Sequence, residues 1–256
     1  NIVVSDIRLD RAKYVSKIYG ADVLSLHDII KDDSVEATIV SSPTSTHYDI
    51  SMKLLEAGKH VLIEKPMTGD STKVLELIDI AKKNNRILMV GFLLRYSPAV
   101  QFFKEYVQQH SKELGRVIMI HSQRINVRIT RKLDVDVVKD LAIHDIDLAM
   151  YMFDGKPIKV YGMGWLPVKE VAEWAVAIIE YETSGLPFNQ VLEVGRISSK
   201  RRRKTEITME NAVISLDLDK HCLELFFEDR SICPNIKAVE PLFLQDKNFV
   251  LSLIHI

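Results

Sequence analysis

The chain changes its pattern of hydrophobic and polar residues near residue 92. Before that point, short apolar runs alternate with segments whose apolar residues recur at helical spacing. The runs fall at 2–5, 37–41, 60–63 and 87–90, and the helical segments at 10–19, 24–31, 46–57 and 72–84. Buried strands that alternate with amphipathic helices are typical of a parallel sheet with helices on both faces. We therefore predict a doubly wound α/β domain over residues 1–92.

Residues 93–250 are dominated by strand-like alternation of apolar and polar positions. Apart from an amphipathic segment at 97–109 and one strongly helical stretch near residue 145, alternation is found at 116–126, 157–163, 174–182, 187–197, 212–218 and 222–228. This pattern predicts an α+β domain with an open, mainly antiparallel sheet. Helices would cover one face of that sheet, and Val176, Ile178 and Glu180 would lie on the other face or point inward. We expect a second copy to cover the free face, in a homodimer or homotetramer.

Both ends of the sequence look cut. A Rossmann unit carries a glycine-rich turn after its first strand and an acidic residue about 20 residues later. Asp6, at the end of the first apolar run, fits that acidic residue, so we expect the first strand and the glycine loop to be missing. Residues 251–256 resemble a non-native tail and are left out of the fold prediction.

Composition places the chain among globular proteins, with 47% apolar and 27% charged residues over 256 positions. The net charge of −1 implies neither a nucleic-acid nor a membrane partner, and no apolar run is long enough to span a bilayer. Cys222 and Cys233 are far apart in the sequence, and no nearby histidines stand at the spacing of metal ligands, so we expect free thiols, no metal site and a cytoplasmic location. The basic run from Lys200 to Lys204 lacks an aromatic platform and favours a solvated hairpin arm over a nucleic-acid site.

The most informative stretch runs from Val61 to Met67. Three apolar residues end a buried strand, and Glu64, Lys65 and Pro66 follow at its carboxyl end, where open α/β sheets bind ligands. A surface lysine on an ordinary loop is the alternative. The flanking segments Ser41–His47 and Leu55–His60 favour a binding site.

A second candidate site begins at Asp140. Asp140 and His144 are four residues apart and share one face of a predicted helix, whereas Leu141, Leu148 and Met152 lie on the neighbouring apolar face. A buried histidine and an N-capping aspartate are the alternatives. We expect Asp145 and Asp147 to be structural, as capping or ion-pairing groups.

These motifs, in this order, resemble the family of glucose-fructose oxidoreductase, inositol dehydrogenase and their relatives, over residues 1 to about 250. The resemblance implies that Lys65 faces the nicotinamide and that the helix with Asp140 and His144 faces the lysine across the cofactor. It thus implies the catalytic residues Lys65, His144 and Asp140, and the cofactor-binding residues Asp6, Ser42, Pro43, Thr44, His47, Glu64, Lys65 and Pro66.

The chemistry suits these residue types. Hydride transfer from a secondary alcohol needs a base for the hydroxyl proton, and an imidazole titrates near working pH. A cation such as Lys65 stabilises the developing alkoxide; members of the family divide the acid/base role between lysine and histidine differently. The Asp6 carboxylate would accept from ribose hydroxyls and repel a 2′-phosphate, which favours NAD over NADP, although Arg8 and Arg11 are near. A plain turn residue is the alternative for Asp6.

We therefore expect an NAD-dependent dehydrogenase of a sugar or nucleotide sugar. Residues 124–128, 133–147 and 240–245 resemble the branch of the family that acts on nucleotide sugars such as UDP-N-acetylglucosamine. An inositol or free-sugar dehydrogenase is the alternative within the same class. A non-catalytic, cofactor-binding regulator is the alternative from another class, and the presence of Lys65, Asp140 and His144 together argues against it.

Overall fold

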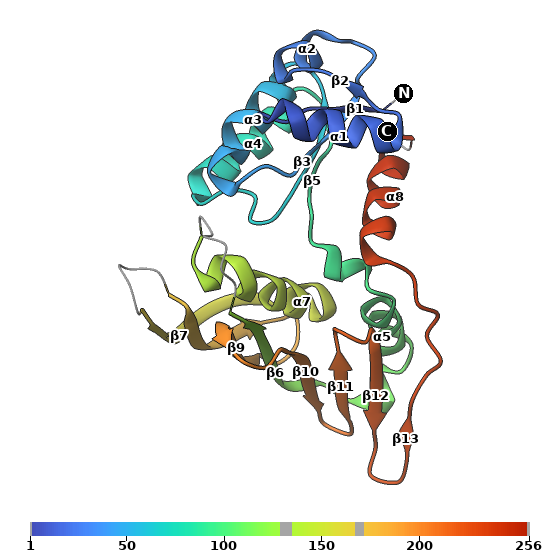
Figure 1. Cartoon of the computed structure of the whole chain (residues 1–256). Helices are drawn as coiled ribbons and strands as arrows, with labels where there is room; N and C mark the ends of the chain where they lie inside the picture. The colour runs from blue at the N-terminus through green and yellow to red at the C-terminus, as the bar shows by residue number, and fades with distance from the viewer. Residues whose placement is uncertain (1, 129–134, 167–171, 255–256) are drawn as a thin grey trace. The chain divides into compact units, whose positions relative to one another are not determined.

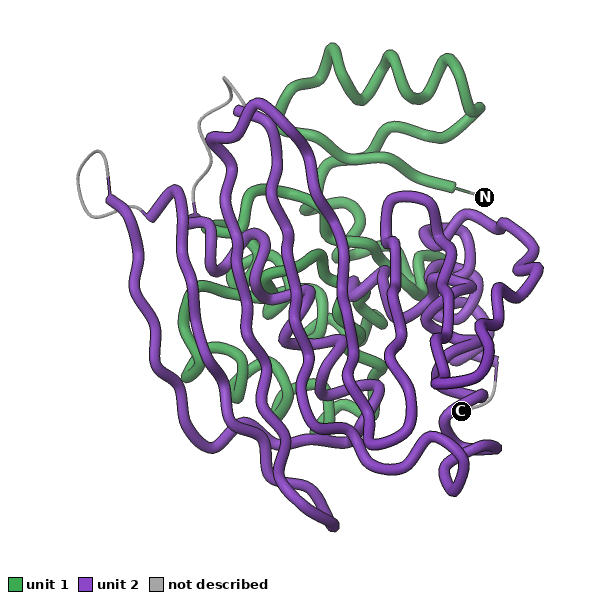
Figure 2. Tube along the Cα trace, turned by 90° about the horizontal axis from the view of Figure 1, so that it is seen from below, with its two compact units in different colours: residues 1–90, 255–256 green, residues 91–254 purple. Residues whose placement is uncertain are grey.

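The computed structural model describes residues 2–128, 135–166 and 172–254 (Figure 1). The chain forms two compact units, of which the first ends at Val90 and the second runs from Gly91 to Ile254 (Figure 2). The change in hydrophobic pattern near residue 92 therefore lies next to the boundary between the units.

The first unit alternates strands and helices, as predicted. Its strands are β1 (Val3–Val4), β2 (Asp22–Val23), β3 (Ala37–Val40), β4 (His60–Ile63) and β5 (Leu88–Val90), and its helices are α1 (Leu9–Tyr19), α2 (Leu26–Lys31), α3 (Thr44–Glu56) and α4 (Ser71–Lys83). Gly20 ends α1 with φ 68°, and its N–H bonds to the Ser16 carbonyl. The side chains of Ser25 and Asp70 cap α2 and α4. The sequence prediction missed β2, because two residues are too few to show a period.

The strands of the first unit are parallel and form two separate sheets, β1-β2 and β3-β4-β5. Parallel strands that alternate with helices are the doubly wound type of fold that we expected. β4 is buried along its whole length, and its Val61 and Ile63 belong to a core cluster with Val40, Leu54, Leu55 and Leu77.

The second unit is built on an eight-stranded sheet in the order β13-β12-β11-β10-β6-β9-β8-β7. Every neighbouring pair is antiparallel except β6 and β9, so the sheet is mainly antiparallel, as predicted. The strands are β6 (Val117–Val127), β7 (Lys156–Trp165), β8 (Trp174–Glu182), β9 (Phe188–Ser198), β10 (Arg202–Met209), β11 (Val213–Asp217), β12 (Cys222–Phe226) and β13 (Ser231–Ile232). The helices are η1 (Leu93–Tyr96), α5 (Pro98–Gln109), α6 (Ser111–Leu114), α7 (Ile143–Phe153) and α8 (Pro241–Ile254), and a π-helical turn, η2 (Val138–Ala142), precedes α7.

Helices cover one face of this sheet, and Figure 1 shows α7 lying across it. The core on this face includes Phe103, Leu148, Ile179 and Tyr181. Successive residues of a strand point to opposite faces, so Val176 and Ile178 lie on the other face, where they are 37% and 47% exposed. The alternation predicted for β8 is therefore correct.

The prediction of a solvated arm at Lys200–Lys204 is correct in part, because Lys200 and Arg201 are exposed before a strand, but it is wrong for Arg202–Lys204. Arg202 begins β10, which lies between β11 and β6 inside the sheet. Long arginine stems can pack along apolar surface while their charged ends stay hydrated, so a basic run can begin a strand.

The suspected tail begins inside a helix. Residues 251–254 belong to α8, in which Gln245 and Phe249 are buried, and residues 255–256 lie outside the described residues. Among the residues that the structure describes, no helix combines the length and the apolar character needed to cross a membrane.

Candidate functional site

The loop after β4 carries the predicted lysine. Val61, Leu62 and Ile63 are fully buried, and the Glu64 N–H donates to the Val40 carbonyl oxygen at 2.9 Å. In the loop that follows, the side chains of Glu64 and Lys65 are partly exposed and Pro66 is buried. The Lys65–Pro66 peptide bond is cis. Lys65 thus lies at the carboxyl end of a buried parallel strand, as predicted.

His47 joins this loop to the loop after β3. Its side chain is 1% exposed, with Nε2 2.7 Å from the Ser42 carbonyl oxygen and Nδ1 3.0 Å from the Pro66 carbonyl oxygen. Pro43 occupies the N-cap position of α3 and Thr44 is the first residue of that helix. The structure therefore brings together both predicted loops, and His47 fixes their spacing.

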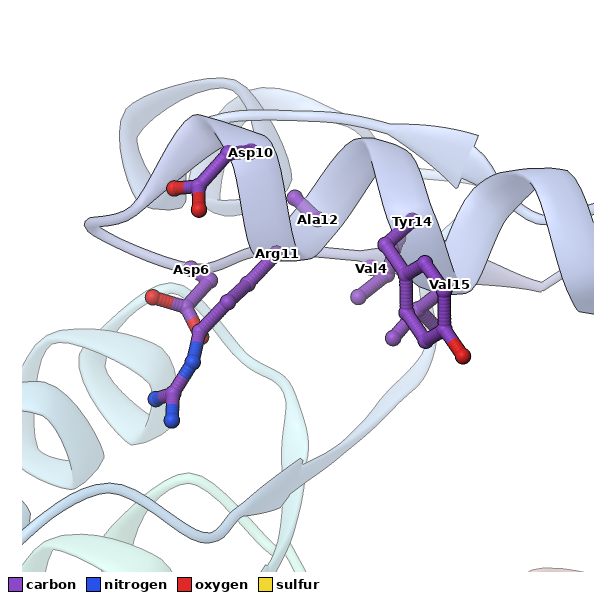
Figure 3. Close-up of a pocket in the computed structure, with 7 residues that line it drawn as sticks. All are labelled: Val4, Asp6, Asp10, Arg11, Ala12, Tyr14 and Val15. Atoms are coloured by element: carbon purple, nitrogen blue, oxygen red, sulfur yellow. The ribbon is translucent and has the colours of Figure 1, made fainter.

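Asp6 lies in the turn after β1, and its Oδ1 accepts the Arg8 N–H at 2.8 Å. The Arg8 guanidinium pairs with Asp10 at 2.7 Å and lowers the pKa of that carboxyl. A pocket of about 570 Å³ opens beside Asp6 (Figure 3); it is lined by Val4, Asp6, Asp10, Arg11, Ala12, Tyr14 and Val15. Asp6 and Arg11 thus offer a carboxylate and a guanidinium to a polar ligand in this pocket, whereas Asp10 is paired with Arg8.

In the second unit, Asp140 lies in the π-helical turn and His144 is the second residue of α7. Asp136 acts as the cap here, because its Oδ1 accepts the N–H groups of Val138 and Lys139 at 2.9 Å each. The alternative that Asp140 is the N-cap is therefore wrong. His144 is 9% exposed, and π-helical turns are frequent at functional sites.

Arg196 is a buried residue beside Asp140 that the sequence prediction did not single out. It is 5% exposed, its Nε donates to Glu173 at 2.6 Å, and its Nη1 lies 3.7 Å from Asp140 Oδ2. The signal was present, because Gln190, Leu192 and Val194 are the buried alternate residues of β9 and Arg196 continues their row.

Asp145 and Asp147 have the structural roles that we predicted. Asp145 Oδ2 accepts from Arg124 Nε at 2.6 Å inside the protein, and Asp147 Oδ2 accepts from Arg95 Nε at 2.9 Å. Burial raises the pKa of Asp147 more than Arg95 lowers it. Among the described residues, no three His, Cys, Asp or Glu side chains are grouped so that they could hold a metal ion.

Sequence comparison finds two family profiles in the chain. The profile described as "Oxidoreductase family, NAD-binding Rossmann fold" matches residues 2–92, and the GFO/IDH/MocA C-terminal domain matches residues 101–215. A UDP-N-acetylglucosamine 3-dehydrogenase of Acidithiobacillus ferrooxidans is 29% identical over 80% of this chain, and the match spans 63% of that enzyme. A myo-inositol 2-dehydrogenase of Thermotoga maritima is 24% identical over 98% of the chain and 85% of that enzyme.

Comparison with solved structures agrees with the fold that the two family profiles describe. The crystallised UDP-N-acetylglucosamine 3-dehydrogenase of A. ferrooxidans superposes with a TM-score of 0.89 and 25% identity, over all of this chain and 81% of that one. A levoglucosan dehydrogenase in complex with NADH and levoglucosan superposes with a TM-score of 0.88 and 18% identity, over 99% of this chain and 80% of that one. The latter likeness concerns the fold alone.

Proposed function

Because the chain belongs to the Gfo/Idh/MocA oxidoreductase family, we propose that it is an NAD-dependent dehydrogenase that oxidises a secondary alcohol of a sugar or nucleotide sugar. One observation carries the proposal. The chain holds a lysine in the loop at the carboxyl end of β4, and it also holds a histidine and an aspartate where α7 begins. A regulator that only binds a cofactor requires none of these three side chains.

The residues of the first unit suit a dinucleotide. Asp6 follows a parallel strand beside a pocket, where its carboxylate can accept hydrogen bonds from ribose hydroxyls and disfavour a 2′-phosphate. Ser42, Pro43, Thr44, Glu64, Lys65 and Pro66 would hold the rest of NAD, with His47 as a positioning residue. When bound, NAD supplies the hydride acceptor.

Side chains of this chain would carry out the proton transfer and stabilise the charge that develops. In the proposed reaction the alcohol's C–H bond breaks as the hydride leaves, and its O–H proton passes to the imidazole of His144 as the carbonyl forms. The ammonium group of Lys65 stabilises the negative charge that develops on the oxygen. Asp140, held beside Arg196, orients the imidazole or accepts a hydrogen bond from a neighbouring substrate hydroxyl.

Two substrate classes have support. The likeness to UDP-N-acetylglucosamine 3-dehydrogenase favours a nucleotide sugar, because that structure superposes over the whole of this chain at 25% identity. The likeness to myo-inositol 2-dehydrogenase, which extends over 98% of the chain, supports an inositol as the second candidate. We prefer the nucleotide sugar.

A substrate panel tests the proposal. The protein is expressed from the complete reading frame that contains residues 1–256 and is offered NAD with UDP-sugars, inositols or free sugars, while nicotinamide absorbance is followed. We expect reduction of NAD with a UDP-sugar, and reduction with myo-inositol alone would favour the second candidate. Binding of NAD without turnover of any sugar would instead support the regulator.

We also propose that a second copy covers the free face of the sheet in the second unit. The pairs Trp165–Trp174, Met163–Val176 and Tyr161–Ile178 lie directly opposite one another on β7 and β8. They form an apolar stripe whose members Tyr161 and Met163 are 59% and 78% exposed. A cytoplasmic location is proposed as well, supported by the free, exposed thiols of Cys222 and Cys233.

A further inference from the structure

A cluster of basic side chains in the second unit has no part in the proposed proton chemistry. It consists of Arg124 on β6, Arg203 on β10 and Arg201, which directly precedes β10; we call these three residues the arginine cluster. Two of them come from the basic run that stood out in the sequence.

The cluster lies on the helix-covered face of the sheet. Arg124 is 2% exposed and donates to Asp145 of α7, so its side chain points toward the helices. Arg203 is the register partner of Arg124, and directly opposed residues of an antiparallel pair share a face. Arg203 also donates to Asn126 Oδ1 at 3.1 Å, and its side chain remains 27% exposed. A ligand can therefore reach Arg203 from solvent.

The cluster carries more positive charge than its described neighbours neutralise. Arg124 has a two-pronged contact with Asp145, at 2.6 and 3.0 Å, and Arg201 has one with Asp219, at 2.7 and 3.2 Å. Arg203 shares Asp219 only through a 3.8 Å contact, and its buried Nε has no hydrogen-bond acceptor among the described residues. Three guanidinium groups thus face two carboxylates.

The pKa of Arg203 reflects this excess of positive charge in the arginine cluster. Burial, followed by the charges of Arg124 and Arg201, lowers the pKa of the Arg203 guanidinium, although Asp219 and Asp145 oppose the change. A partly buried cation without a full counter-charge is unfavourable unless a ligand supplies an anion. A guanidinium presents a planar fork of donors that matches a phosphate group.

We propose that the arginine cluster binds the diphosphate of a nucleotide-sugar substrate, an inference that rests on the proposed function and specifies its substrate class. Arg203 and Arg201 contact the phosphate oxygens, and Arg124 holds the cluster against α7. Asp145, the partner of Arg124, directly follows His144 in the chain, so the bound diphosphate lies at the end of α7 that carries the base. An inositol or free sugar offers no anion to this cluster.

The same diphosphate chemistry occurs in the cofactor, so the test separates the two sources. Calorimetry measures binding of inorganic pyrophosphate, UDP and NADH to the wild type and to Arg203→Met, Arg201→Met and Lys204→Met. Lys204 is a matched control, because it is an exposed cation on the same strand as Arg203. Lys204 and its register partner Gln123 lie on the face of the sheet opposite to the arginine cluster. Urea unfolding followed by tryptophan fluorescence checks that each variant is folded, and Arg203→Lys serves if Arg203→Met is not.

We expect Arg203→Met to weaken binding of UDP and pyrophosphate by about tenfold or more, Arg201→Met to weaken it less, and Lys204→Met to change it by no more than about twofold. NADH affinity should stay within about twofold in all three variants. A wild type that binds neither UDP nor pyrophosphate overturns the inference, as does an equal loss in Arg203→Met and Lys204→Met. If Arg203→Met weakens NADH as much as UDP, the anion is the cofactor's and the substrate assignment is wrong.

These outcomes are independent of the substrate panel. The expected losses of UDP binding, together with no NAD reduction by any sugar, would support the anion site and contradict the proposed dehydrogenase. Oxidation of myo-inositol by a protein that ignores UDP would support the dehydrogenase and overturn the anion site.

Discussion

Replacing Arg124 by methionine should strongly destabilise the second unit. Arg124 and Asp145 are 2% and 1% exposed, and two hydrogen bonds of 2.6 and 3.0 Å join them. The variant keeps most of the side-chain volume but leaves the Asp145 carboxylate buried without its cation. Breaking a buried pair in this way costs about 3–5 kcal/mol. Asp145→Asn should have a cost of similar size, because it leaves the guanidinium buried instead.

The double variant Arg124→Met/Asp145→Leu distinguishes charge burial from loss of packing. Removing both charges leaves no uncompensated ion, and apolar residues of similar volume can replace a buried pair with little loss of stability. The double variant should therefore be more stable than Arg124→Met, with a coupling energy of about 1 kcal/mol or more between the two sites.

Urea unfolding measures these differences. Both tryptophans of the chain, Trp165 and Trp174, lie in the second unit, so their fluorescence follows that unit alone. Arg116→Met is the matched control, because it breaks an ion pair with Glu210 that is exposed to solvent, and its midpoint should stay close to that of the wild type. A cost below about 1 kcal/mol for Arg124→Met, or a double variant less stable than both single variants, would refute the reasoning.

Three further predictions concern the cofactor, pH and assembly. Asp6→Ser should relax discrimination against NADP by about tenfold, because a like-charge clash is removed; an unchanged ratio of kcat/KM for the two cofactors would contradict the ribose contact. Burial, and then Arg86, lower the pKa of His60, whose Nδ1 accepts the Ile87 N–H at 3.0 Å. His60 should therefore add stability at pH values above about 6.5, the ordinary pKa of a histidine. This stability is lost as the pH falls through the lowered pKa of the folded state. Thermal unfolding of His60→Gln should accordingly depend less on pH than that of the wild type. Met163→Asp should convert the assembly to monomers in light scattering, and a monomeric wild type at micromolar concentration would rule out the proposed interface.

Hydrophobic periodicity predicted most of the fold, because burial repeats along each element. β4 was recognisable as three consecutive buried apolar residues followed by charge. β10 was missed because it begins with a basic run, although Thr205, Ile207 and Met209 are buried at alternate positions. The sequence pattern shows which residues are apolar, and arginines can occupy a strand without following that pattern.

The sequence showed which residues could form the candidate site, but it did not show which residues they pair with in the fold. Asp145 and Asp147 were expected to be capping or ion-pairing groups, and the partners with which they pair, Arg124 and Arg95, are 21 and 52 residues away in sequence. The first pair depends on how α7 packs on β6, and the second on how α7 packs against η1. The bridge made by His47 was equally hidden, because both of its partners are backbone oxygens, which every residue carries.

The most direct test of the account is a kinetic comparison of the wild type with Lys65→Met, His144→Ala and the double variant. The proteins are expressed from the complete reading frame, supplied with the best substrate of the panel, and NAD affinity is measured separately. Each single change should lower kcat by about 10²–10⁴-fold while NAD affinity changes far less. If both groups serve one alkoxide, the double variant should lose much less than the product of the two single losses. Near-wild-type turnover in His144→Ala would contradict the account and favour a protein that binds the cofactor without catalysis.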